Sequence, residues 1–355
     1  MRPRTMIQTQ GVVAIDKPAG ITSFQVVSRV KRALKVKKAG HTGTLDPAAT
    51  GLLVVCVGRA TRLAQFITQG DKVYEGTFTL GITTDTYDEE GSVVSRAPVP
   101  KELDFKALEQ AAAALTGTIA QAPPPFSAAK HNGVPLYKLA RKGIEIKKAP
   151  REVEIFSFDI NEVNLPKVSF RINCSKGTYI RSIAHDFGRI LGCGAVLSEL
   201  RRTRSGHMRV EDALDLDAFD RLVQEGRLDQ VLQPVDTALS HVPGIVVNSR
   251  DALKLVQGQG MTTSRLKDYI TEQAPILFQA RPEVLRILAP GRGGSHVLVG
   301  LVAWPESDFT LPALVKVMRI WSEPADISTK PAGHAAALKA QGTGPEQDKE
   351  KILIS

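Results

Sequence analysis

The stretch from Gly40 to Gly51 carries the residues best suited to chemistry. It reads Gly-His-Thr-Gly-Thr-Leu-Asp-Pro-Ala-Ala-Thr-Gly, and its glycines and its proline predict a shaped loop rather than a helix or a strand. Asp46 is the only carboxylate in this loop, and His41 lies near it in the chain. The apolar run at residues 52–57 predicts a buried strand that would hold the loop rigidly. The pattern favours Asp46 as a reactive carboxylate, although an aspartate before a proline can also serve only to form a turn.

Several predicted elements flank this loop and would have to position it. Tyr74, Phe78 and Leu80 alternate onto one face of a predicted strand. Residues 152–160 and 168–174 alternate in the same way and are expected to form strands that can pair. The other expected elements are a buried strand at 11–15, a turn at 16–20, a helix from Thr22 or Ser23 to about Lys35, a short helix at 59–66, a polar loop at 83–91, a helix at 100–115 ended by Gly117, a helix opened by Gly177 and Thr178 and closed by Gly192, and a strand at 196–204.

These elements predict an α+β fold. Strands outnumber helices and no regular strand–helix alternation is visible, which favours a mixed or antiparallel sheet. The composition changes between residues 226 and 240, so we expect a first domain at 1–240. A small β-rich domain is expected at 241–322, and residues 323–355 carry little to bury and are expected to form a disordered tail. The second domain is predicted from strands at 245–247, 296–304 and 314–321 around a helix near 251–256.

The charge of the chain indicates a polyanionic partner. Its 355 residues include 46 Lys and Arg against 37 Asp and Glu, a formal net charge of +9. Basic residues concentrate before Leu45 and again between Ser127 and Arg151, where Asp16 and Glu145 are the sole acidic residues. Either cluster could also be an ordinary solvated surface.

The cysteines and the lack of a long apolar segment indicate the cellular compartment in which the protein is expected. Cys56, Cys174 and Cys193 are too few and too scattered for a disulfide framework, and the first two lie in apolar strand patterns. No secretory signal precedes Asp16, and no apolar run approaches the ~20 residues that a membrane span requires. We therefore expect a reducing, cytoplasmic location and no membrane partner.

Four motifs follow one another along the chain: Asp-Lys-Pro-Ala-Gly-Ile-Thr-Ser at 16–23, the loop at 40–51, Ser-Lys-Gly-Thr-Tyr-Ile-Arg at 175–181, and Leu-Arg-Arg at 200–202. In this order they resemble the TruB family, the bacterial tRNA pseudouridine synthases that act on uridine 55 in the T-arm of tRNA. The resemblance spans residues 11 to about 210 and implies a pseudouridine synthase catalytic domain followed by a small PUA-like RNA-binding module.

The resemblance implies a catalytic group around Asp46. Asp46 matches the catalytic aspartate, and Arg181 matches the arginine that keeps it ionised, although Arg181 could instead contact a phosphate. Tyr74 matches the tyrosine that stacks on uracil and helps to remove the C5 proton; a core aromatic is the alternative. Tyr179 is expected to support the pocket. Leu200 is expected to lie under the base or simply to pack in the core.

The resemblance also implies a group of RNA contacts. His41 would fill the stack that the flipped uridine leaves, unless it is only structural. Lys17, with Pro18, is expected to support the catalytic loop beside the RNA. The basic segment after the prolines at 123–125, including Lys130 and Arg141, would contact phosphates.

The reaction that the family performs imports no group and changes no oxidation state, so neither a cofactor nor a metal is expected. The expected partner is the T-arm stem-loop of tRNA, bound by a monomer that requires no protein partner. Three other functions remain open: the catalytic subunit of a guide-RNA particle, a tRNA-binding folding chaperone, and a metal-dependent hydrolase built on His41 and Asp46. The hydrolase would need further ligands, which the sequence does not supply.

Overall fold

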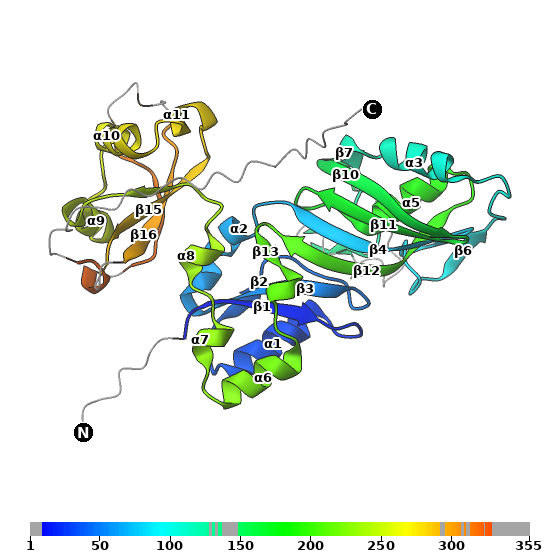
Figure 1. Ribbon diagram of the computed structural model, residues 1–355, viewed down its shortest axis with the longest axis horizontal. Helices are drawn as coiled ribbons and strands as arrows, with labels where there is room; N and C mark the ends of the chain where they lie inside the picture. The colour runs from blue at the N-terminus through cyan, green and yellow to red at the C-terminus, as the bar shows by residue number, and fades with distance from the viewer. Residues whose placement is uncertain are drawn as a thin grey trace, which may run out of the picture. The chain divides into compact units, whose positions relative to one another are not determined.

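The computed structural model describes residues 9–127, 130–131, 134–136, 148–291, 295–306, 309, 313–322 and 324–328. The chain divides into two compact units, with the boundary between Val242 and Pro243. In Figure 1 the first unit runs from blue to green and the second from yellow to orange.

A large mixed sheet forms the framework of the first unit. Its strands follow the order β1-β3-β12-β4-β11-β10-β7, with β2 beside β3 and β13 beside β12. The β12–β3 pair is parallel, whereas the other neighbouring pairs are antiparallel. The mixed sheet and the α+β class predicted from the sequence are therefore confirmed. The strands are β1 (Gly11–Lys17), β2 (Ala39–His41), β3 (Thr50–Val57), β4 (Lys72–Leu80), β7 (Gly117–Gln121), β10 (Arg151–Asn164), β11 (Lys167–Cys174), β12 (Ala195–Ser205) and β13 (Met208–Arg209).

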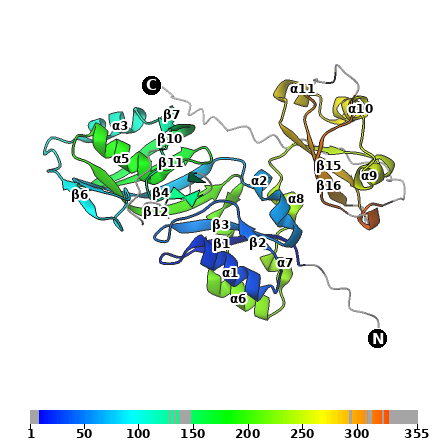
Figure 2. The same cartoon turned by 180° about the vertical axis from the view of Figure 1, so that it is seen from behind.

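Helices of the first unit share one apolar core with this sheet. Side chains of α1, α3, α5 and α6 belong to a single buried cluster with those of the strands. The helix α1 lies beside α6 in both views (Figures 1 and 2), and Arg29 Nε on α1 donates to Asp220 Oδ2 on α6 at 2.9 Å. The helices are α1 (Ser23–Ala33), α2 (Ala64–Ile67), α3 (Phe105–Ala113), α5 (Ile180–Ile190), α6 (Leu216–Gln224), α7 (Leu228–Val231) and α8 (Val235–Ala238), with a 3₁₀ turn at Gly58–Leu63.

Local signals explain several boundaries. Thr22 caps α1 through a capping box with Gln25, which fixes the start of the predicted helix. The predicted helix at 100–115 is shorter in the structure, because Asp104 accepts a hydrogen bond from Ala107 N and so makes Phe105 the first helical residue. The predicted polar loop at 83–91 contains part of a hairpin. Its strands are β5 (Ile82–Thr84) and β6 (Val93–Arg96), and a further short pair is β8 (Lys130–His131) with β9 (Val134–Pro135).

The second unit holds a four-stranded sheet and helices over its own core. The predicted strands correspond to β14 (Gly244–Val246), β16 (His296–Ala303) and β17 (Val317–Ile320), and the predicted helix to α9 (Ser249–Val256). The sequence analysis missed β15 (Val284–Pro290), which lies between β14 and β16, together with α10 (Thr263–Gln273) and α11 (Leu277–Ala280). The unit is therefore mixed rather than simply β-rich.

The described cysteines are free and buried, as the core prediction for Cys56 and Cys174 requires. Among the residues that the structure describes, none of the helices combines the length and the apolar character needed to span a membrane.

Candidate active site

The loop that carries Asp46 is fixed on both sides of that residue. Before it, Ser23 Oγ donates to Leu45 O at 2.9 Å and accepts from Leu45 N at 2.8 Å. After it, Gly20 N donates to Pro47 O at 2.9 Å. The side chain of Leu45 is also buried. The turn and the first helical residue of the 16–23 motif therefore hold the backbone on either side of Asp46 and leave its carboxylate free to point outward.

Lys17 adds a buried clamp to the same loop. The residue has no exposed surface, and its Nζ donates to Pro18 O at 2.9 Å, Ile21 O at 2.7 Å and Pro47 O at 3.0 Å. These three carbonyls use all three donors of an ammonium group. Burial lowers the pKa of Lys17 to about 8, and the nearby charge of Asp46 opposes that effect. Lys17 therefore contacts the backbone of the loop that carries Asp46, and its expected place beside the RNA remains a prediction.

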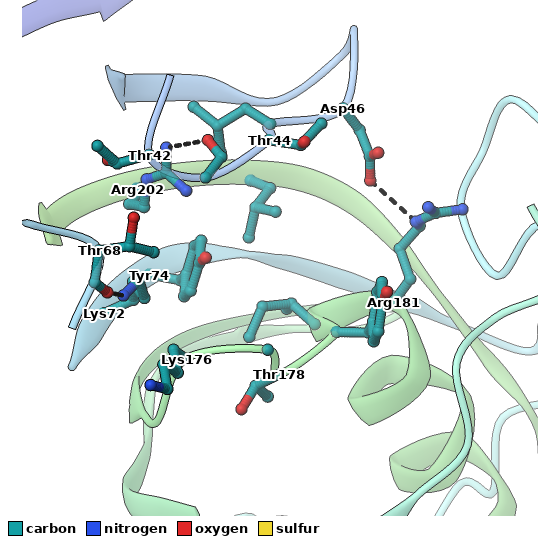
Figure 3. Close-up of a pocket in the computed structure, with 16 residues that line it drawn as sticks. Thr42, Thr44, Asp46, Thr68, Lys72, Tyr74, Lys176, Thr178, Arg181 and Arg202 are labelled. Atoms are coloured by element: carbon teal, nitrogen blue, oxygen red, sulfur yellow. Dashed lines mark hydrogen bonds and ion pairs between the residues drawn. The ribbon is translucent and has the colours of Figure 1, made fainter. Parts of the chain in front are cut away.

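Asp46 and Arg181 form an ion pair, with Arg181 Nε 3.0 Å from Asp46 Oδ2 (Figure 3). The Arg181 side chain is 7% exposed and the Asp46 side chain 43% exposed, so a buried cation presents a carboxylate to solvent. The rest of the guanidinium is also engaged: it donates to Thr86 O at 3.0 Å and Phe126 O at 2.9 Å, and lies 3.4 Å from Asp88 Oδ2. Because every edge of this planar group has a partner, its orientation is fixed.

The start of α5 places Arg181 with the same rigidity. Gln121, at the end of β7, accepts a hydrogen bond from Tyr179 N at 2.8 Å and donates one to Tyr179 O at 3.1 Å. Ser182 Oγ donates to Ala122 O at 3.0 Å. These bonds satisfy polar groups at the helix start, where no side chain of the helix caps it.

A cavity of about 250 Å³ opens beside the ion pair. Five of the residues predicted for the site line it: Asp46, Tyr74, Tyr179, Arg181 and Leu200. They come from the β2–β3 loop, β4, the start of α5 and β12, which are far apart in the sequence. The other lining residues are Thr42, Gly43, Thr44, Leu45, Thr68, Lys72, Lys176, Gly177, Thr178, Ile180 and Arg202.

Tyr74 and Arg202 lie next to each other in the lining of this cavity. They are register partners on β4 and β12, and both are buried. Burial raises the pKa of the Tyr74 phenol, while the neighbouring guanidinium of Arg202 acts against that shift. Arg202 Nε donates to Leu52 O at 2.8 Å, and a second guanidinium nitrogen donates to Gly43 O at 3.1 Å. Arg202 thus ties the loop that carries Asp46 to β3, a role that the sequence did not predict.

His41 does not line the cavity in this structure. It lies on β2, and its buried Nδ1 has no hydrogen-bond partner. Burial, and then the charge of Arg202, lower the pKa of His41, so the imidazole is neutral at pH 7. Its expected place in a vacated base stack remains a prediction. Arg141 and the side chain of Lys130 lie outside the described residues.

Two further charged residues at the site were missed. Asp88 falls in a segment that we interpreted only as a polar loop. Its contact with Arg181 joins two residues that are far apart in the sequence, so no local pattern predicts it. Lys72 is the first residue of β4, two residues before Tyr74. Because residues two apart in a strand share a face, the sequence could have placed Lys72 on the same face as Tyr74. Among the described residues, no cluster of three or more His, Cys, Asp or Glu side chains is arranged to hold a metal ion.

Comparisons with known proteins identify the family of this chain. The model of the TruB family pseudouridylate synthase N-terminal domain matches residues 31–180, and that of the tRNA pseudouridylate synthase B C-terminal domain matches residues 181–240. Proteins named tRNA pseudouridine synthase B are similar to the chain. The one from Aromatoleum aromaticum is 47% identical over 70% of this chain and 80% of its own, and the one from Geotalea uraniireducens is 39% identical over 88% and 97%.

A solved structure is similar over both units of the chain. A chain of a crystallised Cbf5–Nop10–Gar1 complex superposes with a TM-score of 0.65 at 25% identity, covering 88% of this chain and 85% of that one. The family models, the relatives and the fold thus lead to one assignment: the chain belongs to the TruB family of pseudouridylate synthases.

Proposed function

We propose that this protein converts uridine 55 in the T-arm of tRNA into pseudouridine, with Asp46 as the carboxylate that acts on the sugar. The observation that carries the proposal is the ion pair of Asp46 and Arg181 at a cavity that Tyr74 and Leu200 also line. The relatives' name, tRNA pseudouridine synthase B, supports tRNA as the substrate.

The reaction explains why these residue types are needed. The N1–C1′ bond of uridine breaks, the base turns, C5 joins C1′, and the proton on C5 leaves. A carboxylate can act as the nucleophile on C1′ or as the base at C2′, and both routes require its ionised form. Asp46 is 43% exposed in the open cavity, and bound RNA would remove that water. Arg181 then supplies the positive charge that keeps the carboxylate ionised and correctly turned.

The uridine must first leave its stack in the T-loop, at a cost of a few kcal/mol. A buried tyrosine at the cavity wall offers a face on which the flipped base can stack. A neutral His41 is suited to fill the vacated place, because an uncharged ring stacks between bases without having to shed a tightly held hydration shell.

A direct assay tests the proposed function. The protein is incubated with an unmodified T-arm stem-loop that carries tritium at C5 of the target uridine. Isomerisation releases this tritium into water, so release confirms the reaction. No release, with RNA binding intact, would overturn the proposal.

The same assay separates the proposal from a guide-RNA-dependent subunit. The solved structures similar to this chain include complexes of Cbf5 with Nop10 and Gar1, which gives that alternative a structural basis. A stand-alone synthase modifies the stem-loop without any added guide RNA or protein. Activity that appears only after such components are added would favour the alternative.

We further propose that residues 1–240 hold the reaction and that residues 241–322, which hold the helices and strands of the second unit, form a PUA-like module that adds RNA contacts. Three basic side chains, Arg250, Lys254 and Arg265, gather around one hollow on its surface. The expected acting species is a monomer.

Binding of the T-arm is expected to weaken steeply with salt. Phosphate contacts release counterions, so the affinity should fall about tenfold or more between roughly 50 and 200 mM salt. Fluorescence titration of a labelled stem-loop over this range measures the slope. A flat response would contradict a basic RNA-binding surface.

Activity is expected to survive treatment with EDTA, because the isomerisation needs neither redox chemistry nor a Lewis acid. Tritium release before and after chelation and gel filtration measures this. A loss that zinc or magnesium restores would reveal a metal requirement and contradict the prediction.

A further inference from the structure

A second buried lysine, Lys72, lies at the cavity and has no part in the chemistry described so far. It is the first residue of β4 and is 6% exposed. In Figure 3 it lies with Thr68 at the end of the cavity away from Asp46 and Arg181, and Tyr74 stands between the two ends. Its Nζ donates to Thr68 O at 2.8 Å and Gly70 O at 2.7 Å. An ammonium has three donors, so one remains for a ligand.

The charges around Lys72 are mainly positive. Arg202 is buried beside it, and Lys176 lines the same cavity from an exposed position. Asp71 and the thiol of Cys174 also face this lysine. Burial raises the pKa of the Cys174 thiol to about 11, so it is uncharged at neutral pH. Burying two cations side by side is costly unless an anion meets them.

The position of Lys72 within the cavity decides which part of the RNA can supply this anion. In the proposed complex the phosphates would stay with the strand outside the cavity, on the side of the exposed Lys176. The flipped base would then be the part that reaches past Tyr74 toward Lys72 and Arg202. Uracil is neutral while it is attached to the sugar, and it gains negative charge only as the glycosidic bond breaks.

We propose that Lys72, together with Arg202, stabilises the uracil anion that forms when the N1–C1′ bond breaks. This inference rests on the proposed function. The bonding pair of the N1–C1′ bond passes to the base and spreads over N1, O2 and O4. C1′ is then bonded to Asp46, or becomes part of a double bond after C2′ loses a proton. The anion returns its electrons through C5. The new C5–C1′ bond forms as the Asp46–C1′ bond breaks or, on the other route, as the C1′–C2′ double bond takes its proton back at C2′. C5 then gives its proton to water, so no oxidant or reductant is consumed.

Stabilising a charge that exists only after bond breaking accelerates the chemical step rather than binding. Loss of such a group is expected to lower the rate of that step about 10²–10³-fold. A lysine that held a phosphate would instead affect the affinity for RNA.

The charge state of Lys72 gives a second signature. Burial, and then the charges of Arg202 and Lys176, lower the pKa of Lys72 to about 8, while Asp71 and Cys174 oppose that shift. The group is therefore a cation at pH 7 and loses its charge as the pH rises through about 8. The wild-type rate should fall above that pH.

The first test compares single-turnover tritium release by wild type, Lys72→Met and the control Lys167→Met over a range of enzyme concentrations. Lys167 is an exposed lysine at the opposite end of the same β4–β11 pair. For Lys72→Met we expect the maximal rate constant to fall at least about a hundredfold, with half-saturation within about threefold of wild type. For Lys167→Met we expect neither to change. An unchanged rate, or a loss that appears in half-saturation instead, would overturn the inference.

The second test uses Lys72→Arg, which keeps the positive charge. It tests the role of Lys72 even if Lys72→Met folds poorly. A guanidinium stays protonated far above pH 8. The alkaline fall in rate seen for wild type should therefore become smaller in Lys72→Arg. The pKa of Lys17 is also about 8, and because Lys17 is unchanged in both proteins, any fall that it causes is common to them. The same fall in both proteins would refute the role of Lys72. Wild type without tritium release would overturn the proposed function itself, whereas equal release by wild type and Lys72→Met would overturn only this inference.

Discussion

Replacing Asp46 with asparagine is expected to abolish pseudouridine formation and to leave tRNA binding intact. The amide has the same size and can still accept a hydrogen bond from Arg181 Nε, so the loop held by Ser23 and Lys17 should keep its shape. What is lost is the negative charge, which both routes at the sugar require. We expect the rate of tritium release to fall about 10⁴-fold or more, as happens when a reacting group is removed.

The comparison that isolates this effect is Asp88→Asn. Asp88 also contacts Arg181 but is not among the residues that line the cavity, and its side chain is 18% exposed. Its neutralisation should weaken only the anchorage of Arg181 and give a much smaller loss of rate. Binding of a labelled stem-loop is measured for all three proteins. Full conversion by Asp46→Asn would show that Asp46 takes no part in the chemistry. If cells that make the inactive Asp46→Asn protein still grew better than cells that lack the protein, the chaperone function would be favoured.

The loop that carries Asp46 could be predicted because its signals are local. Glycines, a proline and a single carboxylate mark a shaped loop before a buried strand, and the structure shows that loop between β2 and β3. For the motif at 16–23, the family resemblance led us to expect only that Lys17 and Pro18 support this loop. The structure shows that Lys17, Gly20 and Ser23 all bond to the backbone on either side of Asp46.

The remaining parts of the site depend on contacts between distant strands. Arg202 reaches Gly43 and Leu52 only because β12 lies next to β3 in the sheet. Asp88 contacts Arg181 from within a segment whose polar composition indicated only a loop. In the second unit, the apolar residues between Arg281 and Pro290 were not predicted to form a strand, although they form β15. Side-chain chemistry is visible in a sequence, whereas strand order is a tertiary property.

Replacing Arg181 with lysine is expected to lower the rate about 10²–10³-fold while the net charge stays the same. The guanidinium serves four acceptors at once: Asp46, Asp88, Thr86 O and Phe126 O. A lysine places a single ammonium on a flexible stem and cannot satisfy this planar arrangement. The carboxylate of Asp46 would lose its fixed direction, and buried carbonyls would lose their donors. Because the Arg181 side chain is only 7% exposed, affinity for the stem-loop should change little.

Arg189→Lys is the matched control for this prediction. Arg189 lies on the same helix, is 73% exposed and pairs with Asp186 at 3.7 Å, so its substitution with lysine can at most weaken a surface ion pair of small energetic weight. Single-turnover tritium release and stem-loop affinity are measured for both variants, with thermal unfolding as a check on folding. A loss of affinity without loss of the maximal rate in Arg181→Lys would assign Arg181 to a phosphate. A loss of rate at unchanged affinity would instead show that the reaction depends on the fixed orientation of the carboxylate, and not on positive charge alone.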